Sequence, residues 1–317
     1  MSNKELYSRT LSFSLKKLFI DLISLVLFAA LAVGGMLIAE KTFDNGIIGL
    51  VIGAIVGLII AAIISRFVSY RCKAAQIAMM TRGITEGSLP DDVKAEGRRV
   101  VKERFATVAA FFAVTGVIRG IFAELGRVIT KVGNSVGGDT GSAVGSTVST
   151  AVNTLVSYLC DCCLGWVFYR KDKSAGKATC EGAVLFFRHG KTLLRNMGRI
   201  FGMGIASFLV IGGIFAVIAY AILSRFPAFF AEAAKIFAES NDKLRFLSDP
   251  AILVIAAAVL CGAIIWGIIH STFVRPFILV GVLRNYIESG MNDVPTESSF
   301  STVATKSAKF RKLQAEL

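Results

Sequence analysis

The chain has 317 residues, of which 54% are apolar and only 18% are charged, and its mean hydropathy is +0.66. This composition excludes an ordinary soluble domain and favours a helical protein that crosses a membrane several times. A net charge of +13 would also suit nucleic-acid binding, but the basic residues are placed differently from a nucleic-acid site, as shown below.

Long apolar runs predict the membrane-spanning helices. Water cannot hydrate the backbone inside a bilayer, so each run must satisfy its own hydrogen bonds as a helix. The runs are Leu18–Ala39, Ile47–Ile64, Phe105–Ile118, Ile200–Leu223 and Ala251–Val274, with a weaker sixth from Ala143 to Tyr169. We therefore predict an all-α, polytopic membrane protein with about six transmembrane helices arranged as three hairpins.

The second run carries glycines at four-residue spacing. Gly49, Gly53 and Gly57 share one helix face, where the missing side chains allow another helix to approach closely. The segment that follows, 66–104, is predicted to be cytoplasmic and helical, with a break between Gly83 and Pro90.

The third and fourth segments, 105–131 and 140–169, either span the membrane or form a re-entrant pair. Gly137, Gly141 and Gly145 repeat at four-residue spacing and predict another helix-packing face. A polar stripe follows on the same segment, made of Ser149, Asn153, Ser157 and Asp161. Such a helix is poorly lipophilic, so we expect it inside the bundle, with the stripe as a candidate site for a cation or a positively charged substrate. In the alternative reading, Asp161 lies near the cytoplasmic end and is solvated or paired with Arg170 or a neighbour.

The remaining segments include two amphipathic stretches and a tail. In the segment 170–199, Phe186 and Phe187 are expected on the membrane surface. After the last apolar run, Pro276 is expected to kink the chain and turn Phe277–Ile287 along the inner interface. Tyr70-Arg71 and Tyr169-Arg170 each follow an even-numbered segment, a faint repeat that agrees with three hairpins.

Charge predicts the orientation. The basic excess lies in 1–17, 66–104, 170–199 and 275–317, whereas the intervening connections are balanced, as the positive-inside rule requires. We therefore expect a multi-pass protein of the plasma or cytoplasmic membrane with both termini cytoplasmic. The expected parts are a leader (1–17), a six-helix membrane domain (18–289) and a tail (290–317). Anionic lipid headgroups at the cytoplasmic face are expected partners, and nucleic acid is not.

The sequence offers no constellation for catalysis. Cys160, Cys162 and Cys163 cluster, with Cys180 downstream, but their spacing is not that of a zinc site. Nucleophile-elbow, metalloprotease and phosphate-loop motifs are missing from the sequence. We predict no enzyme activity, no metal and no cofactor.

Some residues resemble a known family. Cys180, the run Leu193-Leu194-Arg195-Asn196 and Arg199 look like the cytoplasmic start of a late span in choline transporter-like proteins. The Cys160–Cys163 cluster and the helix Val280–Asn292 are similar in style. The resemblance covers about residues 150–310, and the chain lacks that family's large extracellular loop and about half its length. It implies a transporter of a solute or lipid precursor.

Two functions follow from these patterns. The first is a solute transporter or channel-like permease whose pathway follows the polar stripe on the fourth helix. The second is a non-transporting membrane scaffold, or the membrane subunit of a larger assembly, whose glycine faces contact a second copy or a partner subunit.

Overall fold

The computed structural model describes residues 1–64, 68–106, 108–136, 142–195, 197–238 and 245–316. Within these ranges it leaves out the side chains of 108, 125–136, 142–152, 187, 190–195, 197–199, 236–238 and 245. The described residues form helices and connections only, without a β-strand, so the chain is all-α as predicted.

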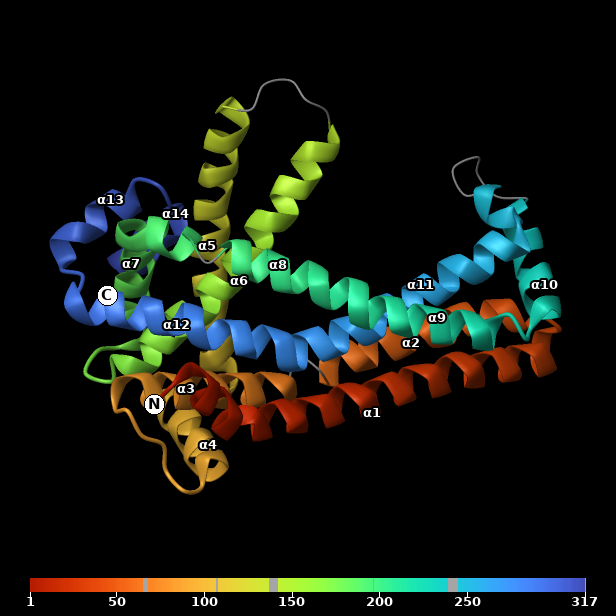
Figure 1. The fold of residues 1–317 in the computed structure, drawn as a ribbon, viewed down its shortest axis with the longest axis horizontal. Helices are drawn as coiled ribbons and strands as arrows, with labels where there is room; N and C mark the ends of the chain where they lie inside the picture. Colours follow the sequence, from red (N-terminus) through yellow and green to blue (C-terminus); the bar gives the residue numbers. More distant parts are fainter. Residues whose placement is uncertain (65–67, 107, 137–141, 196, 239–244, 317) are drawn as a thin grey trace. The chain divides into compact units, whose positions relative to one another are not determined.

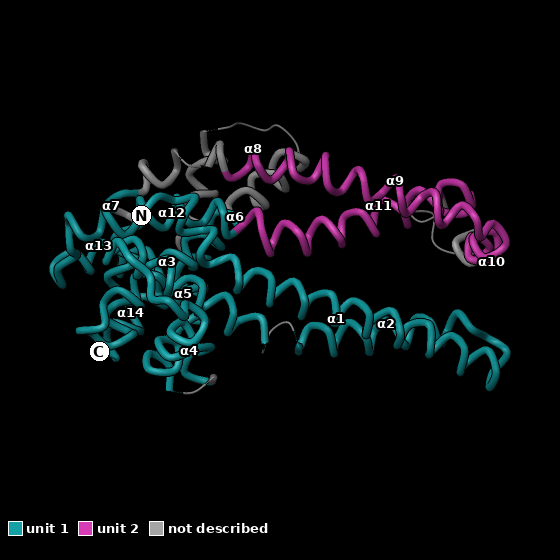
Figure 2. Tube along the Cα trace, turned by 60° about the horizontal axis from the view of Figure 1, so that its bottom comes forward, with its two compact units in different colours: residues 1–197, 276–317 teal, residues 198–275 magenta. Residues whose placement is uncertain are grey.

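The helices (Figure 1) fall into two compact units, which Figure 2 distinguishes by colour. Unit 1 comprises residues 1–197 and 276–317, and unit 2 comprises residues 198–275. The helices of unit 1 are α1 (Asn3–Phe43), α2 (Gly46–Ile64), α3 (Tyr70–Thr85), α4 (Val93–Arg104), α5 (Val108–Val136), α6 (Ser142–Tyr169), α7 (Ala175–Arg195), α12 (Arg275–Asn292), α13 (Phe300–Ala304) and α14 (Ala308–Ala315). The helices of unit 2 are α8 (Met197–Ser207), α9 (Gly213–Leu223), α10 (Pro227–Ala238) and α11 (Pro250–Ile269).

Helices α1 and α2 form a tight antiparallel hairpin (Figure 1). Asp44 adopts a left-handed conformation (φ 55°) at the turn, and its backbone N–H donates to the carbonyl of Glu40. Gly49 and Gly53 face the backbone of α1 so closely that a Cβ atom would lie 2.1 Å and 2.2 Å from carbonyl oxygens of Gly35 and Leu31. The predicted glycine face of the second helix therefore lies against the first helix, with Gly57 one turn further along at Phe28.

Four helical stretches are long and apolar enough to cross a membrane among the residues that the structure describes. They are Asn3–Phe43, Gly46–Ile64, Ile200–Leu223 and Pro250–Asn292. Large apolar side chains on them point outward: Val26 and Ile38 of α1 are 68% and 69% exposed. A fifth candidate exists only as a bent pair, in which α4 meets residues 109–124 at 80°. The structure thus shows four long apolar helices, whereas six membrane-spanning segments were predicted.

The core of unit 1 forms where α3, α6 and α12 meet. Gly165 of α6 brings these helices together, because a Cβ there would lie 2.5 Å from Leu283 of α12 and 3.0 Å from Thr81 of α3. Gly290 of α12 does the same beside the fully buried indole of Trp166. Tyr286 is also buried, and its hydroxyl donates to the carbonyl of Gly182 in α7.

The first residues of the chain belong to this core. Helix α1 begins at Asn3, so the basic leader is continuous with the first apolar run, and its Leu6 and Phe13 are buried. Arg284 of α12 donates to the side chain of Asn3 (2.6 Å) and to the carbonyl of Met1 (2.8 Å). The N-terminal turn of α1 and α12 are therefore held together although they lie at opposite ends of the sequence.

The first half of α5 lies beside the C-terminal tail. Glu124 accepts hydrogen bonds from the hydroxyl of Ser307 (2.6 Å) and the backbone N–H of Lys309 (3.2 Å), which position the start of α14. On the other side, Phe122 stacks edge-on against Phe186 of α7 at 5.6 Å. Phe186 was expected on the membrane surface and is instead buried, because α5 and the tail cover α7.

Unit 2 is a second hairpin, in which α9 packs along α11. Gly262 of α11 lies against the backbone of the partner helix, since a Cβ there would be 2.5 Å from the carbonyl of Gly212. Each helical arm of the hairpin contains one π-helical turn. The first is Phe208–Gly212, before α9, and the second is His270–Val274, after α11. The second turn precedes Pro276, and the helix continues unbroken from Pro250 to Asn292. The expected kink at Pro276 stays a prediction.

Candidate anion-binding site

A rigid frame of three helices carries the candidate site. Gln76 of α3 donates to the carbonyl of Thr10 (3.3 Å) and the hydroxyl of Ser14 (3.1 Å), which fixes α3 against the start of α1. Gly97 of α4 lies at the junction, because a Cβ there would meet Phe13 of α1 at 2.8 Å and the Cβ of Ala75 at 3.1 Å. Side chains on either side of Gly97 are therefore held at fixed positions relative to α1 and α3.

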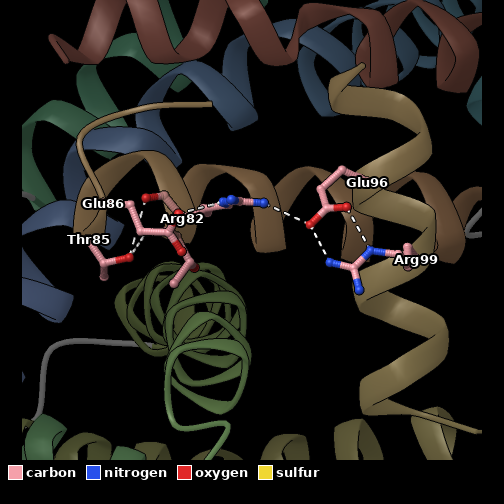
Figure 3. A network of polar contacts seen from close by, with 6 residues as sticks. Arg82, Thr85, Glu86, Glu96 and Arg99 are labelled. Atoms are coloured by element: carbon pink, nitrogen blue, oxygen red, sulfur yellow. Dashed lines mark hydrogen bonds and ion pairs between the residues drawn. The ribbon is translucent and has the colours of Figure 1, made fainter. Parts of the chain in front are cut away.

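Ion pairs on one side of α4 complete this frame (Figure 3). Arg82 of α3 contacts Glu96 of α4 at 2.7 Å and Glu86 at 2.7 Å. Arg99 also holds Glu96, through two nitrogen–oxygen contacts of 2.7 Å and 2.8 Å. The guanidinium groups of Arg99 and Arg82 keep the pKa of the Glu96 carboxyl below its usual range. The acidic residues on this side of α4 are thus already neutralised by arginines.

A pocket of about 840 Å³ opens between α1, α3, α4 and the start of α5. Five cationic side chains line it: Lys16, Arg71, Lys94, Arg98 and Lys102. No carboxylate belongs to the lining within the described part of the chain. The volume is in the range of sites for organic ligands, and the charge of the lining selects an anion.

Three of the five cations form a stripe along α4. Lys94, Arg98 and Lys102 follow one another at four-residue spacing, which places them on one helix face. Like charges at this spacing repel and destabilise an isolated helix. Among the ion pairs of the described residues, none includes these three side chains, whereas the neighbouring Arg99 contacts both Glu96 and Glu103. A bound anion would relieve this repulsion.

Two neighbouring lysines of α1 also differ in this respect, since one is paired with an acid and the other lines the pocket. Lys17 pairs with Asp21, whose other oxygen accepts a hydrogen bond from Ser69 (3.4 Å). Lys16 lines the pocket instead. The pair at Asp21 therefore leaves the positive charge of Lys16 available to a ligand.

The interior of the pocket is apolar and aromatic. Phe105 and Phe111 are buried and meet edge-on at 5.2 Å, and Tyr70 lies over Phe111 at 4.7 Å. Phe13 and Ala75 line the pocket from α1 and α3. The site therefore combines a cationic rim with an apolar interior, which suits a ligand that has an anionic head and an apolar body.

Cys72 lines the pocket and carries a thiol, which is a nucleophile when it is deprotonated. Burial raises the pKa of its thiol, although the nearby Lys16 and Lys17 act in the opposite direction. The thiol is therefore protonated at neutral pH and poorly nucleophilic. Within the described residues, no three His, Cys, Asp or Glu side chains gather in a way that could hold a metal ion.

The predicted polar stripe of α6 is not part of this pocket. Asp161 is buried and pairs with Lys73 of the neighbouring helix α3 at 2.6 Å, which agrees with the alternative reading of a carboxylate paired with a neighbour. Ser157 is half-buried and Asn153 is exposed. Ser149 and the glycines Gly137, Gly141 and Gly145 lie outside the residues whose side chains are described. A transport pathway along this stripe stays a prediction.

A second buried polar cluster joins α6 to α7. Glu181 accepts a hydrogen bond from the indole of Trp166 (3.0 Å) and contacts Arg170 at 3.0 Å. Burial raises the pKa of the Glu181 carboxyl, and the hydrogen bond from Trp166 and the charge of Arg170 lower it less. Arg170 in turn binds Asp172 with two contacts of 2.9 Å. These contacts join α6 to α7 within the fold, and we interpret the cluster as a structural one.

The chain matches no protein-family profile, no curated protein and no solved structure. The resemblance to choline transporter-like proteins therefore stays a prediction, and the site is interpreted from its geometry alone.

The pocket was not among the sites predicted from the sequence. The segment 66–104 was predicted to be cytoplasmic, basic and in contact with anionic headgroups, but the four-residue spacing of Lys94, Arg98 and Lys102 was not singled out. That spacing was the available signal. Lys16 and Arg71 line the pocket because α1 and α3 pack against α4, and this packing cannot be predicted from a local sequence pattern.

Proposed function

We propose that this protein is a membrane-anchored scaffold whose cytoplasmic helical domain binds an anionic ligand in the basic pocket. The observation that carries the proposal is the lining of five cations and no described carboxylate around an apolar interior. This proposal belongs to the second of the two functions expected from the sequence.

The outward apolar side chains support membrane insertion. Val217 of α9 is 70% exposed and Leu260 of α11 is 62% exposed, as are comparable side chains of the first hairpin. Unpaired surfaces of this kind are too large and too apolar for water and suit lipid. We propose four spans in two hairpins, α1 with α2 and α8–α9 with α11.

The contacts of α5 support four spans over six. Glu124 binds the C-terminal tail, whose basic charge assigns it to the cytoplasm under the positive-inside rule. One face of the preceding part of α5, which includes Phe111 and Ile118, is buried within unit 1, whereas Ala113 and Arg119 are exposed. In this proposal the α5–α6 hairpin stays on the cytoplasmic side, which preserves both cytoplasmic termini.

The surroundings of Asp161 support a scaffold over a transporter. A carboxylate that coordinates a transported cation needs access to it, and here Asp161 is 4% exposed and engaged by Lys73. In this proposal, the part of the polar stripe around Asp161 contributes to the packing of α6 against α3.

Topology is tested with single cysteines in a cysteine-free background, labelled on intact cells by a membrane-impermeant maleimide. Asn45→Cys, between α1 and α2, is expected to react from outside. Ser88→Cys and Gly138→Cys are expected to react only after permeabilisation. Labelling of Gly138→Cys from outside would restore the six-span arrangement.

Anion binding is tested by thermal unfolding of the full chain in an uncharged detergent. The probes are inorganic phosphate, pyrophosphate and anionic phospholipids. At least one is expected to raise the Tm of the native protein by more than it raises that of a Lys94→Gln/Arg98→Gln/Lys102→Gln variant. Equal shifts in both proteins with every probe would refute the proposed function.

A further inference from the structure

We infer that the natural ligand of the basic pocket is an anionic phospholipid whose headgroup carries more than one phosphate. This inference rests on the proposed function and specifies its ligand. It follows from the position of the pocket, from its size and from its charge.

The pocket lies where the first hairpin leaves the proposed bilayer. Lys16 comes two residues before the apolar run that begins at Leu18, and Arg71 follows the end of α2. Beside these residues, Leu15 and Phe19 are 52% and 69% exposed, and Val68 is 42% exposed. Outward apolar side chains within three residues of Lys16 and Arg71 in the sequence support an opening at the membrane interface, where a lipid can enter from the bilayer.

The size and lining of the pocket exclude a small inorganic ion as the best-fitting ligand. A free phosphate would fill a small part of about 840 Å³ and would leave the apolar interior without a partner. Phe13, Val101 and Phe105 instead offer a surface for glycerol and the first acyl carbons of a lipid. The cations at the rim then meet the phosphate oxygens.

The number of cations indicates more than one phosphate. A single phosphodiester carries one negative charge, whereas the rim carries five positive side chains. These belong to three helices: three to α4, and one each to α1 and α3. A headgroup with two or more phosphates neutralises more of this charge and can contact more than one of the three helices at once.

The test measures lipid retention by native mass spectrometry of the full chain, released from mixed nanodiscs. The nanodiscs contain phosphatidylcholine with equal phosphate amounts of phosphatidylglycerol (one phosphate) and cardiolipin (two phosphates). Enrichment of cardiolipin over phosphatidylglycerol supports the inference. Equal retention of the two anionic lipids, or preferred retention of phosphatidylcholine, overturns it.

Two adjacent arginines provide a matched control. Arg98→Gln removes a cation of the pocket and is expected to weaken retention of cardiolipin about fivefold. Arg99→Gln removes a cation that is paired with Glu96 and Glu103 and is expected to leave retention within about twofold. Equal effects of the two substitutions overturn the assignment of the site. The triple neutralisation of Lys94, Arg98 and Lys102 is expected to reduce retention about a hundredfold.

Free anions separate this inference from the proposed function. In the thermal unfolding assay, stabilisation by cardiolipin that depends on the α4 stripe supports both. Stripe-dependent stabilisation by pyrophosphate alone overturns the lipid assignment and leaves an anion-binding scaffold. If no probe acts through the stripe, both proposals fail. Circular dichroism of each variant confirms that the helices are retained, since neutralising like charges at four-residue spacing does not weaken α4.

Discussion

The packing of the first hairpin makes a prediction that two neighbouring glycines can test. Gly35 of α1 faces α2, where a Cβ would lie 2.4 Å from the carbonyl oxygen of Gly49 and 3.1 Å from the Cα of Gly53. Gly34 has no atom within 4 Å of its Cβ position. Gly35→Ala and Gly34→Ala therefore make the same chemical change at nearly the same depth, one inside the helix contact and one outside it.

The expected difference follows from the distances. Ordinary contacts of a Cβ begin near 3.4 Å, so an alanine at position 35 must part the two backbones by about 1 Å at the crossing. Overpacking of this kind costs about 1–3 kcal/mol. Alanine also gains about 1 kcal/mol over glycine in helix propensity, but both variants gain it, so it cancels in the comparison. Gly35→Ala is expected to be less stable than Gly34→Ala by about 1–3 kcal/mol.

The assay is thermal unfolding in detergent micelles, followed by a dye that fluoresces on reaction with thiols. Cys162, Cys163 and Cys180 are fully buried and report the opening of unit 1, while the exposed Cys261 sets the baseline. A difference of 1 kcal/mol corresponds to roughly 2–4 °C in Tm for a domain of this size. Equal Tm values for the two alanine variants would refute the close packing of α1 on α2.

Three further predictions concern the core of unit 1. Gly290→Ala places a Cβ 2.4 Å from the ring of Trp166, which is held by Glu181, and is expected to lower the free energy of unfolding by about 1–3 kcal/mol in the same assay. Because burial raises the pKa of Glu181, its contribution to stability is greatest below the ordinary carboxyl pKa of 4.5 and is lost as pH rises through the raised value. The Tm of native protein relative to Glu181→Gln is therefore expected to fall as pH rises from 4.5 through the raised value, and a constant difference would contradict the buried carboxylate. Lys73→Met is expected to destabilise more than Asp161→Asn, because Asp161 is 4% exposed whereas the Lys73 side chain is 41% exposed and can turn to solvent; the reverse order of Tm would contradict that ion pair.

The sequence predicts the apolar helices well because their signal is local. The runs at 18–39, 47–64, 200–223 and 251–274 each lie within one of the four long apolar stretches of the structure. Glycine spacing predicts the contact face of α2 for the same reason, since residues four apart share a helix face wherever the partner lies. Hydropathy and periodicity are properties of single segments, and they do not depend on which other segments pack against them in the fold.

Partners across the core are set by tertiary contacts, which single segments do not report. Helix α3 has a nearly neutral balance of apolar and polar residues, yet Ala74–Met80 is buried because α6 and α1 cover it. Phe186 has the pattern of an interfacial helix, and the same pattern serves a core helix once α5 supplies the covering surface. An amphipathic pattern predicts that one face of the helix contacts an apolar surface. It does not distinguish a lipid surface from a protein surface.

The division of charge on α4 links the fold to the proposed function. Glu96 and Glu103 are both placed to neutralise Arg99, while Lys94, Arg98 and Lys102 face a pocket without a described carboxylate. A stabilising surface would distribute its acids among its cations, since each pair relieves repulsion at little cost. Here Glu96 and Glu103 both pair with Arg99, and the repulsion is left on the side that faces the pocket. An arrangement that costs helix stability in the free protein, and that an anionic headgroup would relieve, is the arrangement expected of a binding site whose ligand comes from the bilayer.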